Sequence, residues 1–245
     1  MQTLRTARGV VRSLGIYYGD RERAAAMDHL HRQFVQPGDL VFDIGAHVGD
    51  HIATFRRLGA RVVAVEPQPA LIATLKMIYG RSSDVMIASK AVGRQTGKLP
   101  MMINMKNPTV SSLSGAFVHA AHGAAGWRDQ VWDRSIEVPV TTLDALIAEH
   151  GTPVFIKIDV EGSEAEVLAG LTQPVDALSF EFTTIQRDVA RACVARCTAL
   201  GFTRFNMALG DSHRLGPWRS ADAIATALGA LPHEANSGDV YATLE

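Results

Sequence analysis

Short apolar runs alternate with helix-length amphipathic segments along the chain from residue 40 onward. Such alternation is typical of βα units, in which helices connect parallel strands and cover the sheet that these strands form. The runs are apolar on successive residues, as expected for strands that are buried on both faces. Five strands are therefore predicted in one central sheet: 40–44, 61–66, 84–89, 154–159 and 177–182. Two further strands, Phe202–Ala208 and Asp239–Leu244, are predicted to close this sheet as an edge pair.

The length of the chain, 245 residues, fits one large α/β domain with additions. We expect an N-terminal helical segment at residues 1–36, which docks on or covers a main domain at residues 37–245. An insertion at about residues 93–142 separates the third and fourth strands, and residues 99–105 and 136–141 within it are predicted to pair as strands. An excursion of this length is usually a subdomain or a lid over a functional site.

Three hydroxyl residues have the spacing of helix N-caps, each with a polar residue three positions later that can bond back to the backbone. These pairs are Thr141 with Asp144, Ser163 with Glu166, and Thr183 with Gln186. A structural role as a cap is therefore predicted for Glu166.

The charges of the chain nearly cancel, because 24 Lys and Arg face 25 Asp and Glu, for a formal net charge of −1. No global field attracts nucleic acid, so we expect no nucleic-acid partner. No apolar run reaches the roughly 18 residues that span a bilayer, and the N-terminus lacks the apolar stretch of a secretory signal. We therefore expect no stable membrane insertion and a cytoplasmic location, with Cys193 and Cys197 as core residues of one helix.

The first 19 residues contain basic but no acidic side chains, with apolar positions on the opposite face if the segment is helical. A targeting peptide or a membrane-surface helix has this pattern. We favour a helix that docks its apolar face on the domain, because further helical sequence follows directly. The basic residues are Arg5, Arg8 and Arg12, and the apolar ones are Leu4, Ala7, Val11 and Leu14.

The most informative motif is Asp43-x-Gly45-x-x-x-Gly49, which ends the first predicted strand and opens a helix. Glycines in such a turn let a ligand approach the backbone, and helix N-termini offer free amides with a partial positive charge. Seventeen residues after Gly49, the second strand ends at Glu66, whose carboxylate can accept both hydroxyls of a ribose. These residues predict a nucleoside site. The alternative is that the glycines serve packing alone.

The same turn favours S-adenosylmethionine over NAD as the cofactor. Dinucleotide folds set Gly-x-Gly-x-x-Gly against a pyrophosphate, and here His47 takes the place of the second glycine. An imidazole obstructs a diphosphate but leaves room for an amino-acid carboxylate, and Asp43 suits a ligand that carries an ammonium group. After the third strand, Lys90 lies where a side chain can flank an adenine. An NAD-dependent oxidoreductase remains an alternative function.

Charged residues gather where the later strands end. Lys157, Asp159 and Glu161 occupy alternate positions at the end of the fourth strand, and Glu181 ends the fifth. Ligands of open α/β sheets bind outside the carboxyl ends of the strands, so these residues and Glu66 predict one site. Asp159 or Glu161 can serve there as proton acceptor, substrate anchor or ligand of a hard metal such as Mg²⁺. The structural alternative is an ion pair between Lys157 and Asp159 together with helix capping.

Taken together, these motifs resemble the FkbM family of S-adenosylmethionine-dependent methyltransferases over roughly residues 35–185. The resemblance implies a class I methyltransferase (Rossmann-like) fold, an α/β three-layer sandwich whose seven-stranded, mostly parallel sheet has an antiparallel last strand. It also implies O-methylation of a hydroxyl on a small molecule or sugar. The segments that carry it are Val41–Asp50, Glu66-Pro67, Val138–Asp144, Lys157–Glu164 and Phe180-Glu181.

The resemblance also implies roles for individual residues. Asp43, Gly45, Gly49 and Glu66 would bind the cofactor, while Asp159 and Glu161 would face the reaction centre; members often have Asn at the place of His47. The full set of candidates comprises the cofactor-binding residues Asp43, Gly45, His47, Gly49, Glu66 and Lys90, the catalytic residues Lys157, Asp159 and Glu161, and the substrate-binding residues Ser111, Ser112 and Glu181. His119 and His122 are alternative bases on the insertion. A non-catalytic member that binds cofactor or a partner protein is a further alternative, and the need for a metal and the oligomeric state stay open.

Overall fold

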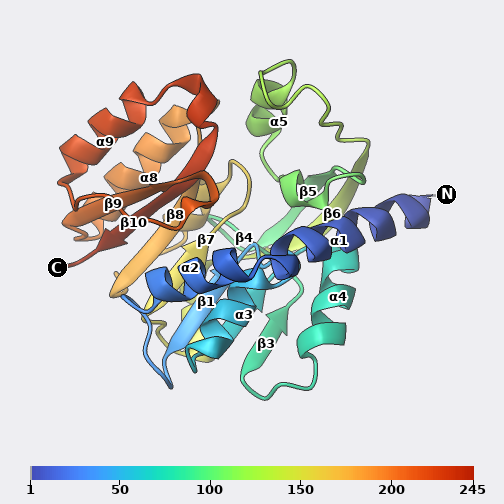
Figure 1. Ribbon diagram of the computed structural model, residues 1–245, viewed down its shortest axis with the longest axis horizontal. Helices are drawn as coiled ribbons and strands as arrows, with labels where there is room; N and C mark the ends of the chain where they lie inside the picture. Colours follow the sequence, from blue (N-terminus) through green and yellow to red (C-terminus); the bar gives the residue numbers. More distant parts are fainter. Residues whose placement is uncertain (1) are drawn as a thin grey trace.

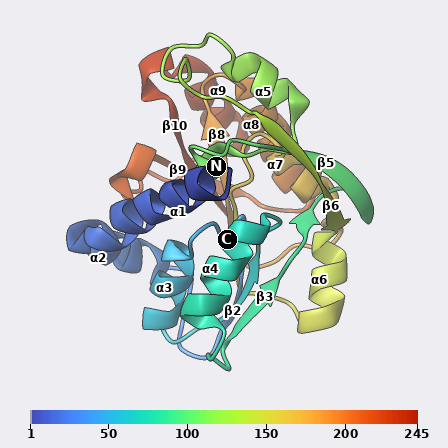
Figure 2. The same cartoon turned by 90° about the vertical axis from the view of Figure 1, so that its right-hand side faces the viewer.

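A computed structural model of the chain describes the backbone of residues 2–245 and the side chains of residues 8–245. Its centre is a seven-stranded sheet with the order β3-β2-β1-β7-β8-β10-β9 (Figures 1 and 2). Neighbouring strands from β3 to β8 pair in parallel, and β10 is antiparallel to both of its neighbours. This order confirms the predicted, mostly parallel sheet with an antiparallel last strand. The strands are β1 (Leu40–Ile44), β2 (Arg61–Val65), β3 (Val85–Ala88), β7 (Phe155–Ile158), β8 (Ala177–Thr183), β9 (Arg204–Leu209) and β10 (Ser237–Thr243).

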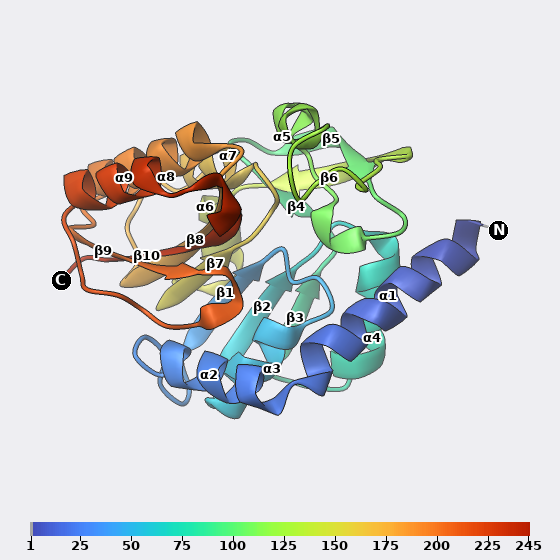
Figure 3. The same cartoon turned by 45° about the horizontal axis from the view of Figure 1, so that its top comes forward.

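Helices cover the sheet on both faces, which produces three layers (Figure 3). Successive side chains of a strand point to opposite faces, so each buried strand supplies two hydrophobic cores. Val41 belongs to the core beneath one set of helices, whereas Phe42 and Ile44 belong to the core on the other face. The first set contains α2 (Arg21–His31), α3 (Asp50–Arg57) and α4 (Pro69–Tyr79), and the second contains α6 (Leu143–His150), α7 (Glu164–Ala169), α8 (Arg187–Ala199) and α9 (Ala221–Ala230). Cys193 and Cys197 of α8 are fully buried free thiols, as predicted.

Two of the predicted helix caps are wrong. The side chain of Ser163 makes no capping bond at the start of α7, and α8 begins at Arg187, after the N-cap Gln186, without a side-chain cap from Thr183. Before α7, the Glu164 carboxylate instead accepts the backbone N–H groups of the preceding loop, at 3.1 and 3.2 Å. Glu166 is therefore free to pair with Arg94, at 2.9 Å on the surface.

At α6 the capping residue lies one position later than predicted. Thr142, not Thr141, accepts the N–H of Ala145 at 3.1 Å. Strands β2 and β7 each end one residue before the predicted limit, so Glu66 and Asp159 stand in the loops at the carboxyl edge of the sheet.

The insertion forms a second, three-stranded sheet with the order β4-β6-β5, together with the short helix α5 (Figure 2). Antiparallel pairing of β5 with β6 confirms the strand pairing predicted within it, with Leu99 opposite Val138. Aromatic rings hold its loop, because Phe117 packs edge-on against Trp127 and Trp132 at 5.2 and 6.1 Å. The elements are β4 (Ala91–Val92), β5 (Gly97–Ile103), η1 (Pro108–Val110), α5 (Gly115–Ala121) and β6 (Arg134–Thr141).

The N-terminal helix α1 (Gln2–Gly19) lies across α4 and contacts η1 of the insertion (Figure 1). Val10 and the partly buried Leu14 and Tyr17 form one apolar cluster with Val48 and Leu71. Val11, predicted on the apolar face, is instead 67% exposed. The predicted contacts of Leu4, Arg5 and Ala7 lie outside the residues whose side chains are described, and the division at residue 36 stays a prediction. Across residues 2–245, no helix combines the length and the apolarity that a membrane span requires.

Candidate active site

A cleft of about 230 Å³ opens at the carboxyl edge of β1, β2, β7 and β8 and extends to the start of β10. That volume is far larger than a few water molecules occupy, so the cleft suits an organic ligand. Nine of the twelve predicted site residues line it: Gly45, His47, Glu66, Lys90, Ser111, Lys157, Asp159, Glu161 and Glu181. Asp43, Gly49 and Ser112 do not contribute to its lining.

The two glycines of the β1–α3 turn are required by packing. Gly45 and Gly49 have φ values of +87° and +88°, which favour glycine. A Cβ at Gly45 would overlap with the carbonyl oxygen of Asp159, and one at Gly49 would lie 2.7 Å from the Tyr79 ring. The packing alternative therefore accounts for both glycines, although Gly45 also lines the cleft. Asp43 lies behind the turn, 1% exposed and opposite Lys157 in the parallel register of β1 and β7.

Glu66 is fixed at the end of β2 with both carboxylate oxygens in place. Oε2 accepts the backbone N–H of His47 at 3.1 Å, and Oε1 accepts that of Gln68 at 2.8 Å. Burial raises the pKa of Glu66 to about 7, against the opposing effect of these two N–H groups. Each oxygen keeps a second lone pair, so the carboxylate can still accept two ligand hydroxyls. This geometry fits the predicted contact with a ribose.

The His47 side chain joins the turn to two distant segments. Its backbone has φ +48°, and its ring packs edge-on against Tyr17 of α1, with centroids 5.4 Å apart. Its Nε2 lies 3.2 Å from the hydroxyl oxygen of Thr109, in the η1 segment of the insertion. Burial lowers the pKa of His47, which favours the neutral ring. The ring therefore helps to assemble the cleft from three parts of the chain.

Lys157 and Asp159 form the ion pair that the structural alternative predicted. Lys157 Nζ lies 2.8 Å from Asp159 Oδ2, with Lys157 3% and Asp159 36% exposed at their side chains. Burial opposes the charge of Lys157, but Asp159, Asp239 and Asp43 outweigh it and raise the lysine pKa well above its usual value. Burial likewise opposes the charge of Asp159, and Lys157 outweighs it and lowers the pKa of that carboxyl. Asp159 is therefore a weak base, held in one place.

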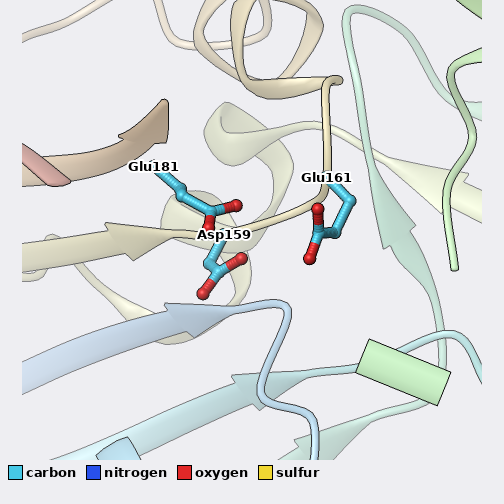
Figure 4. A group of neighbouring side chains, drawn as sticks. All are labelled: Asp159, Glu161 and Glu181. Atoms are coloured by element: carbon cyan, nitrogen blue, oxygen red, sulfur yellow. The ribbon is translucent and has the colours of Figure 1, made fainter. Parts of the chain in front are cut away.

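Glu161 and Glu181 converge on Asp159 from two different elements (Figure 4). Carboxylate oxygens of the three residues lie within 4.8 Å of one another, and three hard oxygen ligands of this kind could hold a divalent cation. Burial, and next the charge of Asp159, raises the pKa of Glu161 and of Glu181 well above the usual range. Glu161 has φ +56° and is 6% exposed, and its Oε2 has no hydrogen-bond partner in the described part of the chain.

The serines of the insertion hold backbone in place. Ser112 Oγ donates to the carbonyl oxygen of Glu161 at 2.5 Å and accepts the N–H of Ser114 at 2.8 Å. Ser111 Oγ accepts the N–H of Asn104 at 3.2 Å. Ser112 thus positions the Glu161 loop from outside the cleft, while Ser111 remains on its wall.

Several residues of the cleft carry no motif in the sequence. Tyr17 and Arg23 reach it from the N-terminal helices, and Asp211 and His213 from the segment after β9. Asp239 has a signal that could have found it, because it is the first residue of the strand predicted at Asp239–Leu244 and lies opposite Glu181 where β10 pairs with β8. Asp50 opens α3; burial opposes its charge, but His51 and Arg23 hold its pKa well below the usual range. The two histidines predicted as alternative bases, His119 and His122, are exposed and do not line the cleft.

Comparison with known proteins identifies relatives among methyltransferases. A 31-O-demethyl-FK506 methyltransferase FkbM from Streptomyces tacrolimicus is 31% identical over 160 residues, 56% of this chain and 61% of that protein. A hexuronic acid methyltransferase AglP from Haloferax volcanii is 27% identical over 155 residues, 62% of this chain and 57% of that protein. The chain thus matches about three fifths of the length of these curated relatives.

A solved structure, precorrin-6y C5,15-methyltransferase from Geobacter metallireducens GS-15, aligns over 92% of this chain and 89% of its own, with 12% identity and a TM-score of 0.44. The fold assignment rests on the strand order of the chain itself.

The family model described as the methyltransferase FkbM domain matches residues 43–193. The match covers more than half of the 245 residues and includes the β1–α3 turn, Glu66 and the three converging carboxylates. It disfavours the NAD-dependent oxidoreductase. The chain belongs to the FkbM methyltransferase family.

Proposed function

We propose that the protein transfers a methyl group from S-adenosylmethionine to a hydroxyl oxygen of a small molecule or sugar. The observation that carries this proposal is a single cleft joining Glu66, at the end of β2, to the carboxylates of Asp159, Glu161 and Glu181. The first position suits a ribose, and the second suits an acceptor hydroxyl that must lose its proton. The names of the two curated relatives, a demethyl-FK506 methyltransferase and a hexuronic acid methyltransferase, support a small molecule or a sugar as the acceptor.

The charge of the cleft fits this cofactor better than a dinucleotide. Seven acidic side chains line it against three from Lys and Arg. Burial raises the pKa of four of these acids, so a cationic ligand would stabilise their ionised forms and an anionic pyrophosphate would destabilise them. A sulfonium and an ammonium group would be attracted instead. The acids are Asp50, Glu66, Asp159, Glu161, Glu181, Asp211 and Asp239, and the basic residues are Arg23, Lys90 and Lys157.

In this mechanism S-adenosylmethionine supplies a methyl group that its sulfonium already activates. Glu66 binds the ribose hydroxyls, and the walls of the cleft hold the acceptor oxygen in line and exclude water. Positioning of this kind is worth about 7–11 kcal/mol. The protein therefore contributes mainly by positioning the cofactor and the acceptor, which agrees with the many contacts that fix the turn and the insertion.

We propose Glu161 as the group that takes the hydroxyl proton. Its Oε2 has no partner within residues 8–245, whereas Asp159 is bound to Lys157, which lowers its basicity. A positive charge beside the three acids favours the ionised form of Glu161. A base so placed contributes roughly 10²- to 10⁴-fold to the rate. In this proposal Asp159 does not take the proton, and its ion pair with Lys157 holds both side chains in place.

Calorimetric titration with S-adenosylhomocysteine tests the cofactor site. We expect wild-type protein to bind it and not to bind NAD, and Glu66→Ala to lose the binding because two charge-assisted hydrogen bonds disappear. Glu137→Ala is the matched control, since that glutamate is 67% exposed and pairs only with a surface lysine. Unchanged affinity in Glu66→Ala, or binding of NAD, would contradict the proposal.

Transfer of labelled methyl groups to a metabolite pool tests the chemistry. We expect Glu161→Gln to bind S-adenosylhomocysteine normally and to lose about 100-fold or more in transfer rate. Full activity of this variant would remove Glu161 as the base and leave Asp159→Asn as the next variant to measure. A wild-type protein that labels nothing would support the non-catalytic alternative. Transfer that persists in EDTA would exclude a required divalent cation at the three carboxylates.

We also propose a cytoplasmic location and no nucleic-acid partner. Cys193 and Cys197 are buried free thiols, as is usual in a reducing compartment. The net charge of −1 offers no field that would draw the protein to nucleic acid.

A further inference from the structure

Arg23 of α2 reaches the wall of the cleft with most of its donors unmatched. Its Nη2 donates to Asp50 Oδ2 at 2.9 Å, and the side chain is 11% exposed. Its Nε and Nη1 are buried and have no acceptor in the part of the chain that the structure describes. Buried donors are nearly always paired in folded proteins, so an unmatched guanidinium at a cleft points to an acceptor that a ligand brings.

Three neighbours fix this guanidinium beside the β1–α3 turn. Asp50 is the first residue of α3 and follows Gly49 directly, so its bond to Arg23 ties α2 to the end of the turn. The Tyr17 ring lies 4.9 Å from the guanidinium carbon, within the range of a cation–π contact. Asp211, from the segment after β9, lies 3.6 Å from the same Nη2. These three contacts therefore hold the positive charge of Arg23 in one position.

The other two basic side chains of the cleft also pair with acids, but neither has a buried nitrogen without a partner in the described residues. Lys157 is bound to Asp159 at 2.8 Å. Lys90 follows β3, and its Nζ lies 3.8 Å from a carboxylate oxygen of Glu149. Among the lysines and arginines that line the cleft, Arg23 is the one that presents unmatched donors next to the turn.

We propose that Arg23 binds the α-carboxylate of the amino-acid part of S-adenosylmethionine, an inference that rests on the proposed function. This part of the cofactor is a zwitterion, so it needs an anionic environment for its ammonium group and a cation for its carboxylate. The acid-rich wall supplies the first, and Arg23 supplies the second.

This subsite would complete the cofactor site from outside the family domain. The family match begins at residue 43, whereas Arg23 and Tyr17 precede it. The docked N-terminal helices are then part of the binding machinery, and their removal would weaken cofactor binding even though the matched domain remains.

Two ligands that differ in the carboxylate separate this role from a structural one. S-adenosylhomocysteine carries the amino-acid group, and 5′-methylthioadenosine lacks it. In calorimetric titrations we expect Arg23→Gln to bind S-adenosylhomocysteine at least about tenfold more weakly than wild type, and methylthioadenosine within about twofold of wild type. Arg21→Gln is the matched control, because that arginine is exposed on the same helix. It should leave both affinities unchanged.

Each other outcome is informative. Equal losses for the two ligands would overturn the proposal, since Arg23 would then act only by holding Asp50 and the turn. Unchanged affinity for S-adenosylhomocysteine would also overturn it, and a raised KM for the acceptor in that variant would assign the arginine to an acidic acceptor. If Arg23→Gln fails to fold by circular dichroism, Arg23→Lys, which keeps a charge beside Asp50, should still lose affinity for S-adenosylhomocysteine alone. A wild-type protein that binds neither ligand would contradict the proposed function itself.

Discussion

Replacement of Lys157 by methionine probes the charge at the centre of the site. Lys157 is 3% exposed in β7, opposite Asp43 in the sheet register and bonded to Asp159. Methionine preserves most of the aliphatic volume, so the substitution chiefly removes the ammonium group. The acids around it then lose the cation that stabilises their ionised forms.

The distance between the charges sets the magnitude. At 2.8 Å the ion pair has a gross Coulomb energy of about 6 kcal/mol for an effective dielectric constant of roughly 20. Part of this is offset because the variant no longer has to desolvate an ammonium group, and removal of one partner from a buried pair costs about 3–5 kcal/mol. Since the Asp159 side chain is 36% exposed, we expect the lower end, about 3 kcal/mol at pH 7. In a protein of this size that corresponds to a fall in Tm of about 6–12 °C.

Urea unfolding at several pH values measures this loss. In wild type the depressed pKa of Asp159 makes the pair stabilising above the unfolded carboxyl pKa of about 3.9, and this stability disappears as the pH falls through the folded value. On the alkaline side, the raised pKa of Lys157 gives stability that is complete below about pH 10.4 and is lost as the pH rises through the folded value. In Lys157→Met the pKa of Asp159 rises, so the deficit relative to wild type should be largest between about pH 5 and 9 and shrink toward pH 4.

A surface lysine provides the control for this experiment. Lys90→Met changes a side chain that is 34% exposed and should alter the free energy of unfolding by no more than about 0.5 kcal/mol. A loss below about 1 kcal/mol in Lys157→Met, or a deficit that does not vary with pH, would refute the reasoning.

Three further outcomes follow from single contacts. Gly45→Ala should lower the free energy of unfolding by about 2 kcal/mol or more in urea titrations, because φ is +87° and the new Cβ meets a backbone carbonyl. Gly97→Ala is the control, since nothing lies near its Cβ, and it should change the free energy of unfolding little. Equal effects of the two substitutions would contradict the steric argument. Trp132→Phe removes the 2.8 Å hydrogen bond from Nε1 to the carbonyl of Val110, so the insertion should lose about 1 kcal/mol of protection against hydrogen exchange. Undiminished protection would show that this hydrogen bond does not stabilise the insertion. With the pKa of Glu66 raised to about 7, wild-type protein should bind S-adenosylhomocysteine more weakly at pH 6 than at pH 8. Glu66→Gln should abolish this difference. If the affinity of the variant still depends on pH, another group is responsible.

The main sheet and part of the site could be predicted from the sequence because both depend on short-range patterns. Runs that are apolar on successive residues mark strands buried on two faces, and β1 and β8 show full or nearly full burial. A residue that ends a parallel strand must lie at the carboxyl edge, which placed Glu66, Asp159 and Glu181 beside one cleft. That these three side chains are carboxylates is read directly from the sequence.

Other predictions failed where the backbone had competing options. Ser163 has the right spacing for a cap, yet the Glu164 carboxylate takes the free N–H groups of that loop. Gly49 and Asp43 belong to the most informative motif and lie outside the lining of the cleft, where Gly49 packs against Tyr79 and Asp43 lies opposite Lys157 of β7. Their role in binding the cofactor stays a prediction. Spacing can suggest which groups are able to interact, and packing decides which of them do.

The sequence by itself determined the order of strands and helices and the acidic edge where a cationic ligand can bind. Only the tertiary structure decided that Arg23 and Tyr17 face that edge and that Lys157 is already neutralised by Asp159. Arg23 meets Asp50 across 27 residues and Asp211 across 188, through the packing of α2 on α3 and on the segment after β9. No local periodicity encodes such contacts, because they arise from the surfaces that separate elements bury together.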